Sequence, residues 1–401
     1  MDSTKQPHVP TILGGISPEQ FLDQYWQKQP LLIRQAFPNF ESPIDGNELA
    51  GLALEEDVES RLIIEHQKEN RWELKSGPFT DSEFGRLPSS HWTLLIQQLD
   101  AWSSEINAIK RAFNFIPNWR IDDVMASYAP IGGSVGPHFD NYDVFLVQAN
   151  GTREWKTGQH CGPESPTLLN TPLCILEHFD ERNKWTLAPG DMLYLPPKLA
   201  HYGIASSDAC ITLSIGFRAP TASQLLGSFT DFILERSNHP AFYEDPTFNL
   251  QDNPGEIVPA AQHAIKALLN EQLNNNIYFT EWLGEFLTEA KNPATLVSDD
   301  SKFDIDRLID ALNTSQTFYR NEGSRFAYIH RQDNVQLFVD GKSFTLGKHC
   351  IAFVKLLCLE DEISAEQLQK SSATLRSDEQ IKPVHQVLCE LINLGSLLLE
   401  D

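Results

Sequence analysis

The stretch between residues 119 and 219 constrains the fold of this 401-residue chain more than any other part. Short runs of β-branched and aromatic residues follow one another there, and Gly, Pro and Asn turns separate them without an intervening helical pattern. Evenly spaced strands without helices between them predict an antiparallel sandwich or barrel. The pair Asn150-Gly151 stands between two of these runs and predicts a two-residue β-hairpin. The runs are DDVMASYAP, GPHFDNYDVFLVQ, TREWKTG, LCILEH, MLYLPP and CITLSIGFRAP.

The residues before this stretch predict a mixture of helices and strands. Residues 17–27 predict a helix, because Ser17 suits the N-cap and Gln20 completes a capping box. The apolar run QPLLIRQAF predicts a strand after Pro30. Residues 91–113 have apolar side chains at helical spacing and predict two helical segments.

The chain becomes helical from Pro220 onward. The sequences TASQLLGSFTDFILERS and AAQHAIKALLNEQLNNNIYFTEWLGEFLTEA are amphipathic patterns of the kind that form a bundle or a dimer face. Residues 291–302 predict a linker, and a helix, an apolar hairpin turning at Asp340-Gly341, further helices and a short strand follow it. That order resembles a winged helix. We therefore expect a mixed α+β protein, with an antiparallel sandwich or barrel and N-terminal elements over 1–220, a helical segment over 221–300 and a winged-helix-like domain over 301–401.

The charge of the chain limits its partners. Lys and Arg number 31 and Asp and Glu 55, for a formal charge of -24. Affinity for the phosphate backbone comes mainly from Lys and Arg, so this balance argues against a general nucleic-acid binder. Acidic residues also outnumber basic ones from Asp304 onward, which argues against a DNA-reading wing. The acidity suits a basic partner, and it also suits solubility alone.

Two further features bear on where the protein works. The start, MDSTKQPHVP, lacks the basic and apolar regions of a secretory signal, and no apolar run is long enough for a membrane helix. The six cysteines form no CxxC pair and lie mostly in apolar runs, which predicts reduced, packed thiols. We therefore expect a cytoplasmic protein without a membrane segment.

Two motifs within the β-rich stretch supply metal-ligating residues. GPHFDNYD places His138 and Asp140 two residues apart, and on a strand such side chains point to the same face. PGDMLYLPPKLAHYG offers His201 as a third ligand after the next strand. Two His and one carboxylate are the ligands of non-haem Fe(II) oxygenases, which keep positions open for a cosubstrate and oxygen. The same ligands suit Mn or Zn, and polar residues at the rim of a barrel give a similar pattern.

A basic residue in the same stretch favours iron chemistry with a 2-oxo acid. In the predicted hairpin Gln148 faces Arg153, and directly opposed residues share a face of the sheet. Counting in twos from the first ligand puts Arg153 on the ligand face, provided that the chain bends near Asn141. A guanidinium makes a two-pronged match to a carboxylate, so Arg153 is suited to hold the far carboxylate of the acid. The alternative is a surface arginine paired with Glu154 or Asp143.

The two motifs, together with WRIDDVMASYAPIGGSVGPHFDNYDVFLVQANGTREWKTG and SIGFRAP, resemble those of the JmjC-type ribosomal oxygenases of the cupin superfamily. Within that group the chain is most similar to the bacterial arginine hydroxylases that act on a large-subunit ribosomal protein. The resemblance runs from YWQKQPLLI to the winged helix, and it implies a double-stranded β-helix and a homodimer formed through the helical segment. By position it implies that His138, Asp140 and His201 bind Fe(II). It also implies that Arg153 anchors 2-oxoglutarate and that Ser127 contacts it, although a plain strand hydroxyl accounts for Ser127 equally well.

The resemblance implies hydroxylation of an arginine side chain, with consumption of O2 and 2-oxoglutarate and release of succinate and CO2. A cationic substrate needs carboxylates or aromatic faces, and those near the motifs are Asp122, Asp123, Tyr142 and Asp143. A JmjC-type demethylase, a hydroxylase of another protein and a non-catalytic metal-binding cupin module are the alternatives. We expect a basic ribosomal protein as partner, no direct contact with nucleic acid or membrane, and binding that weakens with salt.

Overall fold

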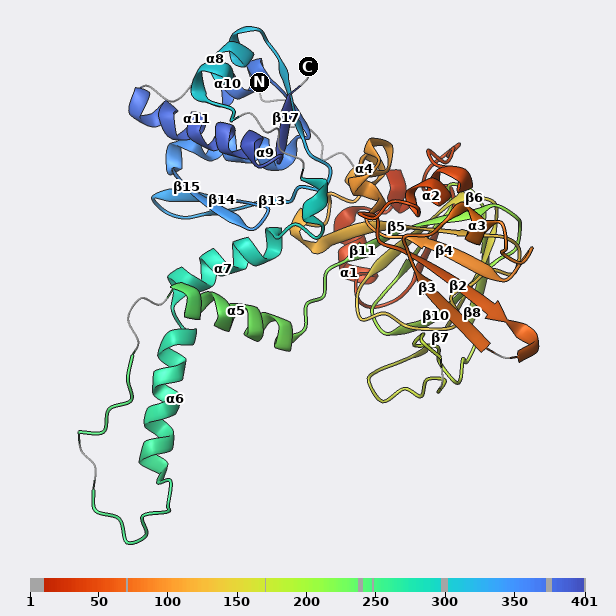
Figure 1. Ribbon diagram of the computed structural model, residues 1–401, viewed down its shortest axis with the longest axis horizontal. Helices are drawn as coiled ribbons and strands as arrows, with labels where there is room; N and C mark the ends of the chain where they lie inside the picture. The colour runs from red at the N-terminus through yellow and green to blue at the C-terminus, as the bar shows by residue number, and fades with distance from the viewer. Residues whose placement is uncertain are drawn as a thin grey trace. The chain divides into compact units, whose positions relative to one another are not determined.

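The computed structural model describes residues 11–69, 71–169, 171–236, 241–246, 249–296, 302–372 and 377–399. The chain forms two compact units, Met1–Ala219 and Pro220–Asp401, and each is described by itself (Figure 1). The further division of the second unit at residue 300 stays a prediction.

The first unit consists of strands with four helices on the N-terminal side of the sequence. Its helices are α1 (Pro18–Gln24), α2 (Gly46–Leu52), α3 (Asp81–Phe84) and α4 (Ser104–Arg111). Its strands are β1 (Leu31–Ile33), β2 (Ser60–His66), β3 (Arg71–Ser76), β4 (Trp92–Ile96), β5 (Ile121–Ala129), β6 (Val144–Asn150), β7 (Arg153–His160), β8 (Asn183–Leu187), β9 (Met192–Leu195), β10 (Leu199–Ala205) and β11 (Cys210–Phe217).

These strands form two antiparallel sheets. The main sheet has eight strands in the order β1-β9-β6-β11-β5-β4-β2-β3, and the smaller sheet has the order β10-β7-β8. Successive strands from β6 to β11 alternate between the two sheets in part, which is the winding of a double-stranded β-helix. The prediction of an antiparallel sandwich or barrel over this stretch is confirmed, and so is the double-stranded β-helix that the resemblance implied.

Both faces of the main sheet are buried, each against a different partner. In β6, Phe145 and Val147 belong to the apolar core that Phe21 of α1 completes. Val144 and Leu146, which point to the opposite face, line a cavity inside the barrel. Because side chains alternate along a strand, one face of the sheet carries the helices and the other forms the wall of the cavity.

The N-terminal elements follow the sequence signals closely. The Ser17 hydroxyl accepts a hydrogen bond from the Gln20 N–H at 3.2 Å, and the Gln20 side chain accepts one from the Ser17 N–H at 3.0 Å. This is the predicted capping box, and α1 begins at Pro18 as expected. The predicted strand after Pro30 is β1, which pairs with β9 in the main sheet.

The prediction of two helical segments over residues 91–113 is wrong for its first half. Trp92–Ile96 form β4, and only Ser104–Arg111 form a helix. In β4, Leu94 and Ile96 join the helix-covered core while Leu95 lines the cavity. A strand buried on both faces carries an unbroken apolar run, and such a run does not distinguish strand from helix by its spacing.

The predicted hairpin at Asn150-Gly151 is also wrong. Gly151 adopts the left-handed backbone that a tight turn requires, with φ +62, but β6 and β7 do not pair with each other. Both edges of β6 are occupied by β9 and β11, and β7 pairs with β8 and β10. The turn therefore carries the chain from the main sheet to the smaller one.

The second unit contains helices and two three-stranded sheets. The sheets have the orders β16-β12-β17 and β13-β14-β15. Its helices are α5 (Ala222–Arg236), α6 (Pro259–Leu273), α7 (Asn276–Thr288), α8 (Ile305–Asn313), α9 (Ile351–Leu359), α10 (Ala365–Ser371) and α11 (Asp378–Asn393). Its strands are β12 (Thr317–Arg320), β13 (Phe326–His330), β14 (Asn334–Val339), β15 (Lys342–Gly347), β16 (Glu362–Ser364) and β17 (Leu397–Leu399).

The predicted hairpin at Asp340-Gly341 joins β14 and β15. Asp340 and Gly341 have φ +49 and +79, as a two-residue turn with both central residues left-handed requires. Strands β12, β13 and β16 were not predicted. The expected linker over 291–302 lies partly outside the described residues, and its described part contains a 3-10 turn at Pro293–Thr295.

Helix α7 connects the two halves of the second unit. Trp282 packs with Phe229 and Phe232 of α5. On its other side Gly284 lies so close to the Phe338 ring of β14 that a Cβ at this position would come within 2.4 Å of the ring. Among the described helices, none has the length and hydropathy of a transmembrane span.

Candidate active site

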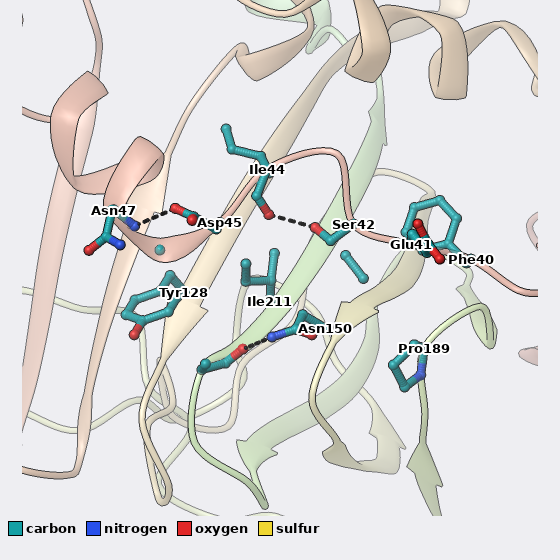
Figure 2. Close-up of a pocket in the computed structure, with 13 residues that line it drawn as sticks. Phe40, Glu41, Ser42, Ile44, Asp45, Asn47, Tyr128, Asn150, Pro189 and Ile211 are labelled. Carbon is teal, nitrogen blue, oxygen red and sulfur yellow. Dashed lines mark hydrogen bonds between the residues drawn. The ribbon is translucent and has the colours of Figure 1, made fainter.

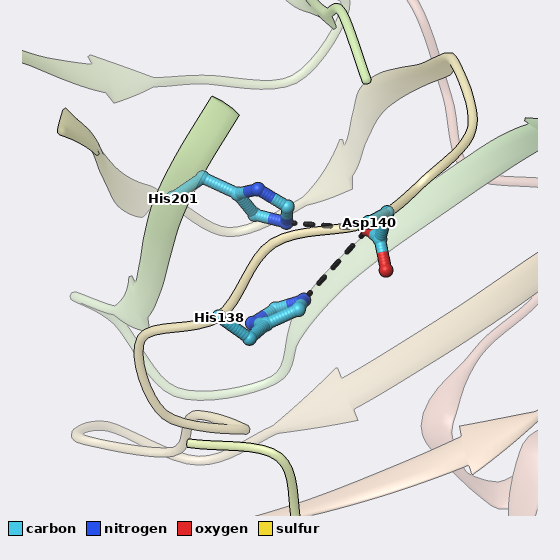
Figure 3. Close-up of side chains that lie close together, drawn as sticks. All are labelled: His138, Asp140 and His201. Carbon is cyan, nitrogen blue, oxygen red and sulfur yellow. Dashed lines mark ion pairs between the residues drawn. The ribbon is translucent and has the colours of Figure 1, made fainter. Parts of the chain in front are cut away.

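The three predicted metal ligands lie together inside the barrel (Figure 3). Asp140 Oδ2 lies 3.5 Å from His201 Nε2 and 3.9 Å from His138 Nε2. The ligand atoms of the three residues all lie within 4.8 Å of one another, and no other group of this kind occurs in the part of the chain that the structure describes. Donor atoms at this spacing can bind one metal ion in common, since metal–ligand bonds to N and O are about 2.0–2.2 Å.

Two backbone hydrogen bonds place the histidines opposite each other. The His138 N–H donates to the His201 carbonyl at 3.0 Å, and the His201 N–H donates to the His138 carbonyl at 2.8 Å. Antiparallel residues that exchange both bonds carry their side chains on the same face. The Lys198 N–H donates to the Asp140 carbonyl at 2.6 Å and extends this short ladder to the third ligand.

The segment before β6 bends near Asn141, as the shared ligand face required. His138 forms an isolated bridge, Asp140 lies outside any strand, and β6 begins only at Val144. A bend at Asn141 and Tyr142 separates the segment that carries His138 and Asp140 from β6. Such a bend was required for Arg153 to share a face with the ligands. The bend is needed because His138 pairs with β10 of the smaller sheet, whereas β6 belongs to the main sheet.

Hydrogen bonds to carbonyl groups fix which nitrogen of each histidine is free for a metal. His138 Nδ1 lies 3.0 Å from the Gly136 carbonyl, and His201 Nδ1 lies 3.0 Å from the Leu199 carbonyl. A carbonyl oxygen only accepts, so both Nδ1 atoms carry the proton and both Nε2 atoms face Asp140 with a lone pair. Burial, together with the nearby His138, lowers the pKa of His201 to about 4, so its imidazole is neutral at pH 7.

The three residues open into a cavity of about 470 Å³ between the two sheets, a size typical of small-molecule sites. Arg153 lines this cavity although it begins the strand after the sheet-to-sheet turn. The predicted pairing of Gln148 with Arg153 is wrong, because Arg153 lies opposite Ala205 of β10. Arg153 nevertheless shares the interior of the barrel with the three ligands.

Arg153 is 3% exposed, and its guanidinium Nε and Nη2 are buried without a hydrogen-bond partner. The surface alternative is therefore excluded. Glu154 forms ion pairs with Lys184 and Lys156, and Asp143 accepts hydrogen bonds elsewhere. A buried cation with unused donors is costly unless an anion binds to it. The cavity thus combines three side chains that could hold a metal ion with a separate cation that could bind a carboxylate.

Small residues on β10 make room for large ones on β7. Gly203 lies opposite Trp155, and Ala205 lies opposite Arg153. The indole lies against Gly203, where a Cβ would come within 2.7 Å of the ring. The Trp155 ring is 6.0 Å from the His201 ring and 5.8 Å from the Arg153 guanidinium carbon, so it occupies the wall between them.

Ser127 projects from β5 into the same cavity. It is buried, and its hydroxyl lies 3.4 Å from the Thr212 carbonyl. This weak hydrogen bond leaves the hydroxyl able to turn toward a ligand. Contact between Ser127 and a cosubstrate stays a prediction.

Of the four residues predicted for a cationic substrate, three line the cavity, namely Asp122, Asp123 and Tyr142. Asp143 does not. It is fully buried and accepts hydrogen bonds from the Tyr194 hydroxyl at 2.6 Å and from Gln27 Nε2 at 2.9 Å. Burial raises the pKa of Asp143, although both hydrogen bonds oppose the rise. This carboxylate joins the N-terminal segment to the barrel.

Sequence reasoning missed Arg61 and Gln97, which line the cavity beside Asp123. Arg61 comes from β2, Gln97 directly follows β4, and Asp123 comes from β5. These three strands are neighbours in the main sheet. No motif marks these residues, since their proximity arises only when the strands pair.

A second cavity lies on the first unit, away from the metal-ligating group (Figure 2). Tyr128, Asn150 and Ile211 come from the strands, and the segment from Phe40 to Asn47 lies across from them. Its polar side chains include Ser42, which donates to the Ile44 carbonyl, and Asn150, which donates to the Ala209 carbonyl. None of the predicted site residues lies here.

Two family models match separate parts of the chain. Residues 108–225 match the family model described as the JmjC domain, and residues 271–398 match the one described as a ROXA-like winged helix. The predictions of a JmjC-type barrel and a C-terminal winged helix are confirmed.

Two curated relatives cover most of the chain. The ribosomal protein uL16 3-hydroxylase of Escherichia coli is 35% identical over 311 residues, which are 76% of this chain and 80% of that protein. A Haemophilus influenzae protein named "Probable ribosomal oxygenase" is 31% identical over 342 residues, which are 82% of either protein.

A solved structure shares the fold over almost the whole length. The structure of Escherichia coli YcfD, a ribosomal oxygenase, in complex with cobalt and 2-oxoglutarate superimposes with a TM-score of 0.83 at 30% identity. The superposition covers 96% of this chain and 99% of that one.

Proposed function

Because the chain belongs to the family of JmjC-type ribosomal oxygenases, we propose that it is the 2-oxoglutarate-dependent oxygenase that hydroxylates an arginine side chain of ribosomal protein uL16. Two features support the reaction class. The chain is similar to a ribosomal protein uL16 3-hydroxylase over most of its length, and its fold matches a ribosomal oxygenase solved with cobalt and 2-oxoglutarate.

The observation that carries the proposal is the pairing of a His-Asp-His group with an unpartnered buried arginine in one cavity. His138, Asp140 and His201 would hold Fe(II), and Arg153 would hold the distal carboxylate of 2-oxoglutarate. Fe(II) together with this cosubstrate activates O2, places one oxygen atom in a substrate C–H bond and releases succinate and CO2.

The chain itself supplies position and a dry environment. The two Nδ1–H···O=C hydrogen bonds hold the imidazoles with Nε2 toward Asp140, and Arg153 would orient the cosubstrate along the cavity. Val144, Leu146 and Met125 line the walls with apolar groups that exclude water. Ser127 would donate a hydrogen bond to the cosubstrate.

Selection of an arginine would rest on the acidic part of the cavity. Asp122 and Asp123 lie in its lining with the Tyr142 ring, and carboxylates and aromatic faces are the groups that bind a guanidinium. The charge of -24 would favour approach of a basic ribosomal protein and disfavour direct contact with RNA. Such a substrate places the enzyme in the cytoplasm.

Self-association would use the helical part of the second unit. Large apolar side chains on α5, α6 and α7 are exposed within this unit, among them Leu226, Leu234, Ile265, Leu269 and Ile277. Solvent-exposed apolar side chains in such numbers mark interaction surfaces. A second copy of the chain, forming a homodimer, would cover them.

Mass spectrometry of ribosomal proteins tests the proposal. In cells that contain the protein, an arginine of uL16 should be heavier by one oxygen atom, and in cells that lack it the same residue should be unmodified. Demethylation would instead release formaldehyde and remove a methyl group. Identical spectra from the two cells would overturn the assignment of uL16 as substrate.

A further inference from the structure

Asp143 binds the N-terminal segment of the chain through both of its carboxylate oxygens. The Tyr194 hydroxyl donates to Asp143 Oδ1 at 2.6 Å, and Gln27 Nε2 donates to Asp143 Oδ2 at 2.9 Å. Arg120 Nη2 lies 3.6 Å from the same Oδ2. Asp143 is fully buried, so these side chains replace the water that a carboxylate otherwise binds.

Gln27 and Tyr194 also bind each other, which closes a small network of hydrogen bonds. The Gln27 N–H donates to the Tyr194 hydroxyl oxygen at 2.7 Å. Trp26 stacks on the Tyr194 ring with the centroids 5.8 Å apart, which places Gln27 beside the hydroxyl. Gln27 has φ +58, a left-handed backbone that is uncommon for a residue other than glycine. Contacts with residues distant in the sequence thus determine the conformation at Gln27.

This network lies directly after the bend that follows a candidate metal ligand. Asp140 and Tyr142 line the cavity, whereas Asp143 does not. The Lys198 N–H donates to the Asp140 carbonyl at 2.6 Å, and the Phe217 N–H donates to the Asp143 carbonyl at 3.1 Å. These backbone bonds hold the two ends of the bend, and the Asp143 side chain fixes its rotation.

Loss of the network would therefore reach the metal ligand. A carboxylate without partners does not stay in an apolar core, because burial of an unpaired charge is costly. Asp143 would turn out of the core, and the short connection would turn Asp140 with it. A metal ion needs its ligand atoms in a fixed arrangement, so such a rotation would weaken its binding.

We propose that Asp143 is a positioning residue for the metal site, because its hydrogen bonds to Gln27 and Tyr194 fix the direction in which Asp140 points. Among the described residues, none before Arg61 lines the cavity, yet the N-terminal segment is in this way part of the active site. The inference rests on the proposed function only for the presence of a metal ion.

Asp191 offers a matched comparison for Asp143. It is 3% exposed, and it accepts hydrogen bonds from Arg34 Nη1 at 2.6 Å and from the Gln35 N–H at 3.0 Å. It therefore joins the same N-terminal segment to the start of β9, but it does not line the cavity. Loss of Asp191 should reduce stability and leave the metal ligands in place.

The experiment measures binding of Co(II) alone to the full-length protein, so it needs neither cosubstrate nor substrate. The visible absorption of Co(II) reports both the amount bound and the geometry of its ligands. Asp143→Ala should bind Co(II) about tenfold more weakly than the wild type, as loss of a group that supports a metal ligand predicts, and with an altered spectrum. Asp191→Ala should keep the affinity and the spectrum of the wild type, although urea should unfold both variants more easily.

Two further variants separate positioning from folding. Asp143→Asn should restore most of the affinity, because asparagine accepts from Tyr194 and donates to the Gln27 amide once that amide turns over. Tyr194→Phe keeps the packing of the ring and removes two of the three hydrogen bonds that link Gln27, Tyr194 and Asp143. It should lose affinity as Asp143→Ala does, and it serves as the test if Asp143→Ala does not fold.

Wild-type affinity and spectrum in Asp143→Ala or in Tyr194→Phe would overturn the proposal. An equal loss in Asp191→Ala would also overturn it, because the N-terminal segment would then support the fold alone. Asp143→Asn as weak as Asp143→Ala would refute the role of the hydrogen bonds. A wild type that binds no Co(II) would refute the metal site and this inference with it, whereas absence of uL16 hydroxylation with the expected affinities would refute only the substrate.

Discussion

The Arg153 guanidinium lies inside the barrel with two nitrogens that bond to nothing in the protein. An unpaired buried cation lowers the stability of a fold, and chains keep one where a ligand needs it. Trp155 and Ala205 hold it in place by packing and do not satisfy its donors. Under the proposed function, Arg153 would therefore serve ligand binding while it lowers the stability of the unliganded fold.

We expect Arg153→Met to weaken cosubstrate binding strongly while it stabilises the metal-free protein. The loss of two charge-assisted hydrogen bonds should weaken 2-oxoglutarate binding about 100-fold or more. Removal of the unpaired charge should raise the free energy of unfolding by about 1–2 kcal/mol. Calorimetry with Mn(II) and urea denaturation measure the two effects.

Arg86→Met, at an exposed loop position, is the matched control and should change neither quantity. If Arg153→Met bound 2-oxoglutarate as tightly as the wild type, the anchoring role would be wrong.

His201 should make the metal-free protein less stable in acid. Burial lowers its pKa to about 4 from the ordinary value of 6.5, so the unfolded chain binds a proton more readily than the folded one. The stability that this histidine contributes is complete above pH 6.5 and is lost as the pH falls toward 4. Between pH 7 and pH 5 the loss should be about 2 kcal/mol.

His201→Asn should remove this part of the pH dependence, as denaturation at both pH values would show. His330→Asn, at an exposed position in the second unit, should leave it unchanged. If the free energy of unfolding changed with pH to the same extent in the wild type and in His201→Asn, a neutral, buried His201 would be contradicted.

At the residue scale, sequence reasoning reached the residues whose types and spacing carry chemistry. The three candidate metal ligands, His138, Asp140 and His201, could be predicted from sequence motifs alone. Arg61 and Gln97 were missed, because an Arg and a Gln in a strand are ordinary until the neighbouring strands bring them to Asp123. Asp143 was predicted for the substrate site but does not line the cavity. Its position beside the motif did not indicate that Tyr194 and Gln27 would bind its carboxylate.

Strand β10 controls the shape of the cavity through small residues. Gly203 allows the Trp155 indole to lie against the strand, because a Cβ there would come within 2.7 Å of two ring carbons and 2.9 Å of a third. The indole cannot retreat without disturbing Arg153 and His201, which it separates. This strand therefore couples packing to the position of two functional residues.

We expect Gly203→Ala to destabilise the protein by about 1–3 kcal/mol, the usual cost of overpacking a core. It should also weaken 2-oxoglutarate binding, because a displaced indole shifts Arg153. Urea denaturation and calorimetry with Mn(II) measure these effects. Gly162→Ala, where a Cβ meets nothing within 4 Å, should be neutral in both. A Gly203→Ala protein with unchanged stability would show that the indole moves freely.

Among the helices and turns, predictions were correct where interactions between residues close in sequence determine the structure. The Ser17 capping box and the Asp340-Gly341 turn formed as predicted, because their hydrogen bonds and dihedral angles involve adjacent residues. Residues 92–96 became a strand since pairing with β2 and β5 outweighed their helical spacing. The Asn150-Gly151 turn formed without its hairpin, because both edges of β6 were taken by other strands.

At the scale of the whole molecule, the exposed apolar side chains of α5–α7 predict the assembly. We expect a double substitution, Ile265→Asp with Leu269→Asp, to convert the proposed homodimer to a monomer, because two charges would have to be buried in the interface. Sedimentation velocity measures the change. Leu359→Asp, at another exposed leucine, should leave the assembly unchanged. A wild-type protein that sediments as a monomer would refute the dimer itself.

The overall composition predicted less about function than the motifs did. The charge of -24 excludes no fold and no chemistry, and it gains meaning only with an acidic cavity and a basic substrate. The two units also differ in what could be foreseen. The barrel followed from short strands and turns, whereas the packing of α7 on β14 depends on Gly284 and Phe338, which no pattern connects.

Under the proposed function, one cavity would bind metal, cosubstrate and an arginine of uL16 for a single oxidation. Purified uL16, incubated with the protein, Fe(II), 2-oxoglutarate and O2, tests it when the mass of the substrate and the succinate released are measured together. We expect one added oxygen atom on an arginine for each succinate formed, and neither product with His138→Ala. Oxygen addition that persists with His138→Ala, or succinate formed without any change in uL16, would contradict it.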